Sequence, residues 1–376
     1  MLFYCAFCEK KLSKMICRTH KLLPVLCIIT QKSYLCKDKN VYNMKCKILT
    51  IIVLLVSATL FGCGGGNQDQ APTEPRELLA FLEAKIKQNP KDAELYYERG
   101  RVLLQLDEIT DAINSLTQAI ALKSGVEKYH LLLADAHLRN GQVKESYADL
   151  QEVLTINPKN IDAYMKRGEI ALFSRDYDRS IESIDKALEL DNLNPKAYFM
   201  RGYVFLEKGD TTEAVRNLRK TIDLDNEYAS AYELLGLLFI NRNDPLGVEY
   251  LNTATTLDPN NITALYALAL HYQDNADIEK AENFYNRVLA INPHHVDALH
   301  NLGYIELTFK EDNDKAIDYF TQVLAIDPNN IQAHTNRALA YEQKGDKAKA
   351  REGYRQALDL APTYAPAVEG IKRVGK

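Results

Sequence analysis

No cysteine follows residue 63 in this chain of 376 residues, because all seven cysteines lie at or before Cys63. The part of the chain beyond that point can therefore form no disulfide, no thiolate metal site and no cysteine nucleophile. The chain also lacks the bias of collagen-like, low-complexity or wholly disordered proteins, since 46% of its residues are hydrophobic and 26% are charged. We therefore expect a folded, globular body.

Acidic residues outnumber basic ones beyond residue 63. The whole chain has 46 basic and 51 acidic residues, but ten of the basic and only two of the acidic ones lie in residues 1–63. The remainder therefore has 36 basic against 49 acidic residues and a net charge of −13. An acidic excess of this size gives no electrostatic footprint for nucleic acid and repels anionic surfaces. We expect no nucleic-acid partner.

The only long apolar run lies near the N-terminus, in the sequence MKCKILTIIVLLVSATLFGC that begins at Met44. Lys45 and Lys47 precede 14 apolar or small residues, Ile48 to Phe61. A helix that spans a bilayer needs about 20 residues. The run is therefore too short to span a membrane, and it has the length of the apolar region of a secretory signal peptide.

This segment ends in Leu-Phe-Gly-Cys at residues 60–63. It resembles the lipobox of bacterial lipoproteins, which has an aliphatic residue three before the cysteine and a small residue just before it. The resemblance implies that residues 44–62 are a signal peptide and that the Cys63 sulfur carries acyl chains, palmitate among them. Each buried methylene contributes about 0.8 kcal/mol to such an anchor. Gly64, rather than Asp, follows the cysteine, which favours the outer membrane of a bacterial envelope, on its periplasmic or surface face.

The residues on either side of this signal have simple interpretations. Residues 63–74 begin with three glycines after Cys63 and continue with mostly polar residues, and we expect a flexible tether. Residues 1–43 precede the expected start at Met44 and are interpreted as an over-extended N-terminus. Their Cys-x2-Cys-x8-Cys-x2-His spacing is close to that of zinc ligands, but the intervening residues offer no turn to fold a zinc knuckle. We expect no metal and no cofactor.

Beyond the tether the sequence repeats itself with a nearly constant period. The segment PKDAELYYERG at residues 90–100 recurs in several copies, and successive copies start 33 to 35 residues apart. Such a period indicates a repeat architecture. A small residue follows ten residues after each start: Gly100, Ala134, Gly168, Gly202, Gly236, Ala269, Gly303 and Ala338. In the second half of each unit, alanines such as Ala112 and Ala316 precede the large residues Leu116 and Phe320 at i+4, on one helical face.

This pattern resembles the tetratricopeptide repeat. The resemblance implies an all-α fold, a right-handed superhelix (an α-solenoid) of about eight helix-turn-helix repeats over residues 93–362. Residues 75–92 form an N-terminal flanking helix in this interpretation, and residues 363–376 form a capping helix that shields the last repeat. The fifth repeat is one residue shorter near residues 241–245, and the seventh is one residue longer near residues 310–314.

The resemblance also implies that the first helices of the repeats line a concave groove, with ligand contacts at fixed positions. Aromatic rings supply contact area at low entropic cost, and asparagine pairs with both groups of a peptide bond. Two alternatives to ligand binding stay open. In the first, the aromatic rings serve only to cover neighbouring helices. In the second, Asn301 and Asn336, which occupy the same position in consecutive repeats, form too short a row to bind a peptide backbone. The groove candidates are Tyr97, Lys128, Lys166, Phe199, Tyr203, Tyr266, His300, Asn301, Tyr304 and Asn336.

Motifs for catalysis are absent from the sequence: it has no glycine-rich phosphate loop, nucleophile elbow or zinc-protease helix. Nearly every residue from 75 onward belongs to the repeats, so we expect no enzyme. The sequence favours a membrane-anchored scaffold or adaptor lipoprotein that binds a protein or peptide partner and supports assembly of envelope complexes. Two alternatives are a glycan- or peptidoglycan-associated binding lipoprotein and a non-catalytic accessory subunit of an envelope enzyme. The oligomeric state is left open.

Overall fold

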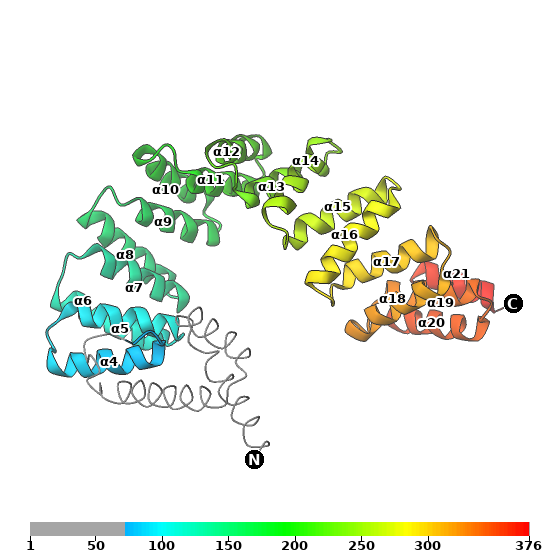
Figure 1. Ribbon diagram of the computed structural model, residues 1–376, viewed down its shortest axis with the longest axis horizontal. Helices are drawn as coiled ribbons and strands as arrows, with labels where there is room; N and C mark the ends of the chain where they lie inside the picture. Colours follow the sequence, from blue (N-terminus) through cyan, green and yellow to red (C-terminus); the bar gives the residue numbers. More distant parts are fainter. Residues whose placement is uncertain (1–71, 376) are drawn as a thin grey trace, which may run out of the picture. The chain divides into compact units, whose positions relative to one another are not determined.

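The structure is a computed structural model that describes residues 72–375. This part of the chain contains eighteen helices and no strand (Figure 1). The expected all-α fold is therefore confirmed. Cys63, the signal peptide at 44–62 and the N-terminal residues 1–43 lie outside the described residues, as does most of the tether at 63–74.

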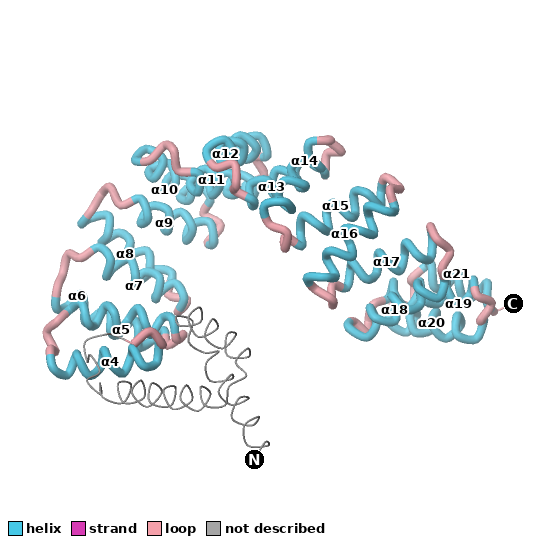
Figure 2. Tube along the Cα trace, viewed as in Figure 1, coloured by secondary structure: helices cyan, strands magenta, loops and turns pink. Residues whose placement is uncertain are grey.

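The helices carry the labels of Figure 1. Their bounds are α4 Pro75–Gln88, α5 Ala93–Gln105, α6 Ile109–Leu122, α7 Glu127–Arg139, α8 Val143–Ile156, α9 Ile161–Phe173, α10 Tyr177–Leu190, α11 Pro195–Lys208, α12 Thr211–Leu224, α13 Ala229–Ile240, α14 Leu246–Leu257, α15 Ile262–Asp274, α16 Ile278–Ile291, α17 Val296–Thr308, α18 Asn313–Ile326, α19 Ile331–Gln343, α20 Lys347–Leu360 and α21 Ala365–Val374. Short loops join all of them (Figure 2).

The helices form eight pairs, from α5 with α6 to α19 with α20, and each second helix also packs against the first helix of the next pair. The flanking helices α4 and α21 pack on the first and last pairs. First helices also touch the first helices of neighbouring pairs, as α5 does α7 and α13 does α15. The first helices therefore lie together on one side of the stack, which we call the inner face.

Side-chain caps explain where many of the helices begin. An asparagine before the helix accepts a hydrogen bond from the backbone N–H three residues on in α9, α11, α15 and α19. An aspartate does the same for α10, α12, α16, α18 and α20. Such a cap contributes about 1 kcal/mol, because it satisfies a backbone donor that has no partner inside the helix.

The small residues that recur, one in each repeat, lie where the two helices of a pair meet. All eight of them are buried, and a Cβ atom added to Gly100 would lie only 2.7 Å from Cγ of Leu116. Leu116 and Ala112 on α6 are themselves fully buried. The two helices of a pair thus approach closely at the small residue, and a large side chain from the second helix fills the space above it.

The two irregular repeats differ in their inner turns. In the fifth repeat, α13 and α14 have 12 residues each, and Asn241–Pro245 connect them. Asn243 in that turn adopts a left-handed φ of 54°, a conformation that asparagine tolerates better than most residues. In the seventh repeat, residues 309–312 connect α17 to α18. Among the described helices, none is both long enough and apolar enough to be a membrane span.

Candidate functional site

Two cavities open on the inner face, on either side of α13. The first has a volume of about 420 Å³, and we call it the Phe199 cavity. Residues from α9, α11, α13 and the loop before α13 line it: Glu169, Leu172, Lys196, Phe199, Met200, Tyr203, Tyr228, Ser230, Glu233 and Leu234. Two groove candidates from the sequence, Phe199 and Tyr203, therefore share one cavity.

Aromatic rings dominate the Phe199 cavity. The Phe199 and Tyr228 ring centroids lie 4.9 Å apart in a tilted arrangement, a geometry that favours aromatic pairing. Tyr203 is 38% exposed. Burial of its ring, followed by the nearby Glu207 carboxylate, raises the pKa of its hydroxyl. At the rim, the Lys196 ammonium lies 3.6 Å from Oε1 of Glu169, and the Glu233 carboxylate accepts a hydrogen bond from the Asn261 amide. The cavity thus offers an apolar, aromatic surface.

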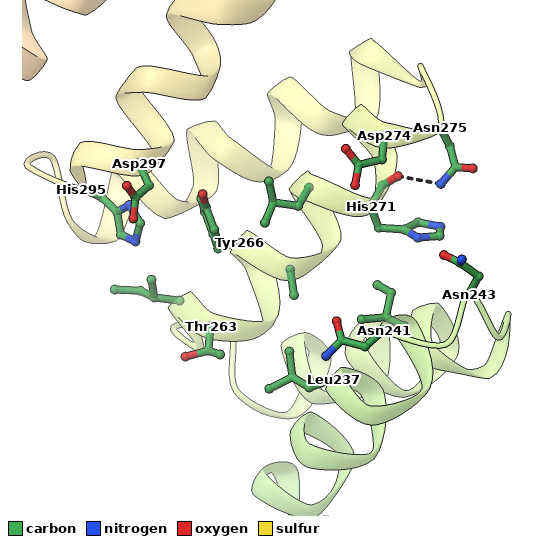
Figure 3. A pocket seen from close by; sticks show the side chains of 14 residues that line it. Leu237, Asn241, Asn243, Thr263, Tyr266, His271, Asp274, Asn275, His295 and Asp297 are labelled. Carbon is green, nitrogen blue, oxygen red and sulfur yellow. Dashed lines mark hydrogen bonds between the residues drawn. The ribbon is translucent and has the colours of Figure 1, made fainter. Parts of the chain in front are cut away.

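The second cavity has a volume of about 480 Å³ and lies between α13, α15 and the start of α17; we call it the Tyr266 cavity. Figure 3 shows Tyr266 between His295 and Asp297 at one end and His271 and Asp274 at the other. Its remaining walls are Leu237, Ile240, Asn241, Asn243, Ile262, Thr263, Ala267, Leu270 and Asn275. This cavity combines apolar walls with two carboxylates, two imidazoles and several neutral polar side chains.

Contacts from the next repeat hold Tyr266 in place. The Asn301 side-chain amide donates hydrogen bonds of 3.0 Å to the hydroxyls of Tyr266 and Tyr285. The ring of His295 lies 5.2 Å from that of Tyr266, centroid to centroid. Burial raises the pKa of the Tyr266 hydroxyl. Tyr266 is therefore a fixed wall of the cavity.

The two asparagines of the proposed ladder both have partners within the chain. The Asn301 amide nitrogen contacts the two tyrosine hydroxyls. The Asn336 amide nitrogen lies 3.2 Å from Nε2 of His300. A peptide ligand would have to compete with these contacts, and binding of a peptide backbone by Asn301 and Asn336 stays a prediction.

The remaining candidates lie away from the two cavities. Lys128 forms an ion pair with Glu94, and its ammonium lies 4.6 Å from the centroid of the Tyr97 ring. Lys166 forms an ion pair with Asp135. Near the other end of the inner face, Tyr304 is 37% exposed and packs edge-on against Phe309. The structure thus brings three of the ten candidates, Phe199, Tyr203 and Tyr266, to cavities.

Sequence reasoning missed most of the polar wall residues, and four polar or aromatic ones show why. Counted from the first residue of each first helix, Asp297 and Asp274 are the second and thirteenth residues of their repeats. The family resemblance implies ligand contacts at both of these positions, so a search of every such position would have found the two aspartates. Tyr228 and His295 precede their helices in the connecting loops. No helical periodicity marks such residues.

His300 should make stability depend on pH. Burial lowers the pKa of its imidazole below the ordinary 6.5, although Asn301 and Asp297 act in the opposite direction. The unfolded chain therefore binds a proton at this histidine at a higher pH than the folded chain does. As a result, the contribution of His300 to the free energy of unfolding falls as pH drops through 6.5 toward the lowered pKa. We expect His300→Gln to flatten the dependence of Tm on pH between about 7.5 and 5.5.

The exposed neighbour His294 supplies the control for this measurement. His294→Gln should leave the slope of Tm against pH as it is in the parent chain. An identical slope in the His300→Gln chain would show that His300 does not carry the effect.

Family models described as tetratricopeptide repeats match most of the repeat region. They cover residues 97–161 and 309–365, 161–192, 184–216 and 260–329, and a model described as TPR repeat covers 202–241. Together these matches span more than half of the chain.

Individual relatives are more distant. DnaJ homolog subfamily C member 7 from Homo sapiens is 28% identical over 134 residues, which is 32% of this chain and 27% of that protein. The chain thus spans about a quarter of the length of this curated relative.

Solved structures give matches of low overall similarity. PilF of Pseudomonas aeruginosa is 17% identical with a TM-score of 0.47, and the match covers 54% of this chain and 93% of that one. The Cut9–Hcn1 hetero-tetramer of APC/C is 19% identical with a TM-score of 0.44, covering 82% and 61%. MamA is 22% identical with a TM-score of 0.39, covering 42% and 91%.

Proposed function

Because this chain belongs to the tetratricopeptide-repeat proteins, we propose that it is a scaffold or adaptor that binds an extended segment of a protein partner on its inner face. The observation that carries this proposal is the pair of cavities on that face, each walled by residues of successive first helices. Ligand pockets of proteins have volumes of about 300–1,000 Å³ and mostly apolar walls with a few polar groups. Both cavities have such a volume, and the Phe199 cavity also has mostly apolar walls, whereas the Tyr266 cavity is more polar.

Exposed apolar residues near the Phe199 cavity support the same proposal. Phe173 follows the wall residue Leu172 at the end of α9 and is 79% exposed. Tyr203 lies in the cavity and is also partly exposed. Large apolar side chains left in water next to an apolar cavity are typical of interaction surfaces. A partner segment would cover them on binding.

The binding site can be located by photo-crosslinking. A photoreactive amino acid at Tyr203 or Tyr304 should capture the partner, whereas the same probe at Arg216 should not, because Arg216 is an exposed residue of the second helix α12. Mass spectrometry identifies the captured protein. Capture from position 216 alone would place binding on the outer helices and contradict the proposal.

Affinity then measures the contribution of the aromatic wall. With the identified partner, Phe199→Ala and Tyr203→Ala should each weaken binding by about tenfold or more, because buried aromatic anchors dominate interface energies. Isothermal titration calorimetry gives the Kd values. The matched control is Tyr177→Ala, a change at the start of the second helix α10, which should leave Kd unchanged. An unchanged Kd in both cavity variants would contradict the assignment.

We further propose that acyl chains on Cys63 anchor the scaffold in a bacterial envelope, at the outer membrane, where it supports assembly of an envelope complex and has no chemistry of its own. The sequence support is the apolar run that ends at residues 60–63 and the polar tether behind it. Cells grown with labelled palmitate should incorporate label into the chain. Cys63→Ser should abolish the label, whereas Cys46→Ser should not. Label that persists in the Cys63→Ser chain would contradict the anchor.

A further inference from the structure

The charge on the inner face changes at α13. On the helices before it, carboxylates pair with cations of the next first helix: Glu94 of α5 with Lys128 of α7, and Asp135 of α7 with Lys166 of α9. Glu169 of α9 continues the series with Lys196 of α11. These pairs leave that half of the inner face close to neutral.

The next three first helices contain no lysine or arginine at all, as the sequences of α13, α15 and α17 show. Two of their carboxylates, Asp274 and Asp297, line the Tyr266 cavity. Among the described residues, neither carboxylate forms an ion pair or a side-chain hydrogen bond. Arg242 follows α13 closely in sequence, but its guanidinium donates a hydrogen bond to the Thr211 hydroxyl on α12 and not to either carboxylate. The cavity therefore holds negative charge that the chain itself leaves unmatched.

The other walls of this cavity suit a long basic side chain. Leu237, Ile240 and Leu270 offer apolar surface along which the methylene stem of a lysine or arginine can lie while its charged end reaches a carboxylate. The face of a tyrosine ring attracts a cation as well, by about 0.5–2 kcal/mol, and Tyr266 lies between the two carboxylates (Figure 3). Stem, ring and a carboxylate at either end match the chemistry of a basic residue whose charged end reaches Asp297 or Asp274.

One segment can reach both cavities, because α13 lies between them. Leu234 lines the Phe199 cavity and Leu237 lines the Tyr266 cavity. A helix with its side chains is about 10–12 Å across, and an extended chain advances about 3.3 Å per residue. A few residues of extended chain are therefore enough to cross α13.

We propose that the Tyr266 cavity binds a lysine or arginine side chain of the partner and that the Phe199 cavity binds a large apolar side chain close to it in sequence. This inference rests on the proposed function and adds the chemistry of the partner. The inner face then selects segments that combine a basic and an apolar residue. Asp274 and Asp297 are the residues that select the basic one.

Random 12-residue peptides displayed on phage and selected on the purified full-length chain test this proposal. Selected peptides should be enriched in Lys or Arg within a few residues of Leu, Met or Phe. Binding of a selected peptide, measured by fluorescence anisotropy, should weaken at least tenfold in the Asp274→Asn/Asp297→Asn chain. It should also weaken with added salt in the parent chain more than in this variant, because salt screens the exposed carboxylates.

The matched control is Asp223→Asn/Asp359→Asn, which removes two exposed carboxylates from the second helices α12 and α20. This control should leave the Kd unchanged. Circular dichroism spectra should show that both double variants keep the helical content of the parent chain.

The outcomes separate this inference from the proposed function. The selected peptides could lose affinity in the Phe199→Ala chain and yet show neither basic enrichment nor a response to the aspartate variants. This result would overturn only the inference. Failure to select any peptide, or binding that ignores Phe199→Ala as well, overturns the proposed function and the inference together. A charge reversal tests the inference directly. The Asp297→Lys chain should bind a selected peptide better when the basic residue of that peptide is changed to glutamate.

Discussion

Phe320→Ala is expected to lower the free energy of unfolding by about 3–5 kcal/mol. Phe320 on α18 is fully buried, in a cluster that includes Leu299 of α17 and Ala333 of α19. Its Cε1 would lie 2.9 Å from a Cβ atom placed on Gly303. Truncation of the ring therefore leaves a cavity between three helices, and the glycine beneath it has no side chain to fill the space.

The loss should be local. In a repeat array each unit contacts only its neighbours, so stability is close to a sum of repeat and interface contributions. Urea unfolding followed by circular dichroism should show an earlier transition in the Phe320→Ala chain. Hydrogen exchange should assign the lost protection to α17–α20 and leave α5–α10 protected.

Phe173→Ala is the matched control, because it removes the same ring from a position that is 79% exposed. Surface substitutions of this kind change stability by about 0.5 kcal/mol or less. Equal losses in the two chains, or a loss below about 1 kcal/mol in Phe320→Ala, would contradict the packing described for α18.

The helices and their core could be predicted from the sequence because the same packing requirement recurs in every repeat. A pair of helices must approach closely at one point, and this requires a small residue such as Gly236, where an added Cβ would lie 2.5 Å from Cγ of Leu251. Asn160 and Asp176, at the starts of α9 and α10, fix helix boundaries by capping. Local chemistry and repetition were sufficient for this part of the fold.

The site could be predicted only in part, because it depends on contacts between residues 16 to 36 positions apart. Periodicity places Lys128 and Lys166 on the inner face, but it does not reveal that Glu94 and Asp135 neutralise them. It likewise places Asn301 there without revealing that Tyr285, from a second helix, takes its hydrogen bond. Whether a polar group faces a ligand or a neighbour is decided by tertiary packing.

Gly247→Ala is expected to destabilise the middle of the array by about 2 kcal/mol, as overpacking typically does. Gly247 lies in the first turn of α14, and an added Cβ would lie 2.7 Å from Cα of Ile240 and nearer still to its backbone nitrogen. A backbone cannot rotate away as a side chain can, so α13 and α14 must separate. The better helix propensity of alanine, at most about 1 kcal/mol, offsets only part of this cost.

Gly168→Ala is the matched control for this change. Its added methyl would meet only side-chain atoms within 3.4 Å, Cγ1 of Ile184 and Cε of Met200, each at 3.0 Å. Methionine adapts readily to such crowding, and three other repeats carry alanine at the same position. Urea unfolding should therefore show a markedly smaller loss for Gly168→Ala than for Gly247→Ala. Equal losses of unfolding free energy in the two variants would contradict the close backbone contact between α13 and α14.

Gly247→Ala should also alter the Tyr266 cavity on the inner face. Ile240 is a wall of the Tyr266 cavity as well as the residue that Gly247 approaches. Movement of the α13 end away from α14 alters the distance between that wall and Asp274 on α15. We therefore expect Gly247→Ala to weaken a basic peptide selected on the parent chain, at temperatures where the variant is still folded. Destabilisation with unchanged peptide affinity would show that the end of α13 packs the core without shaping the site.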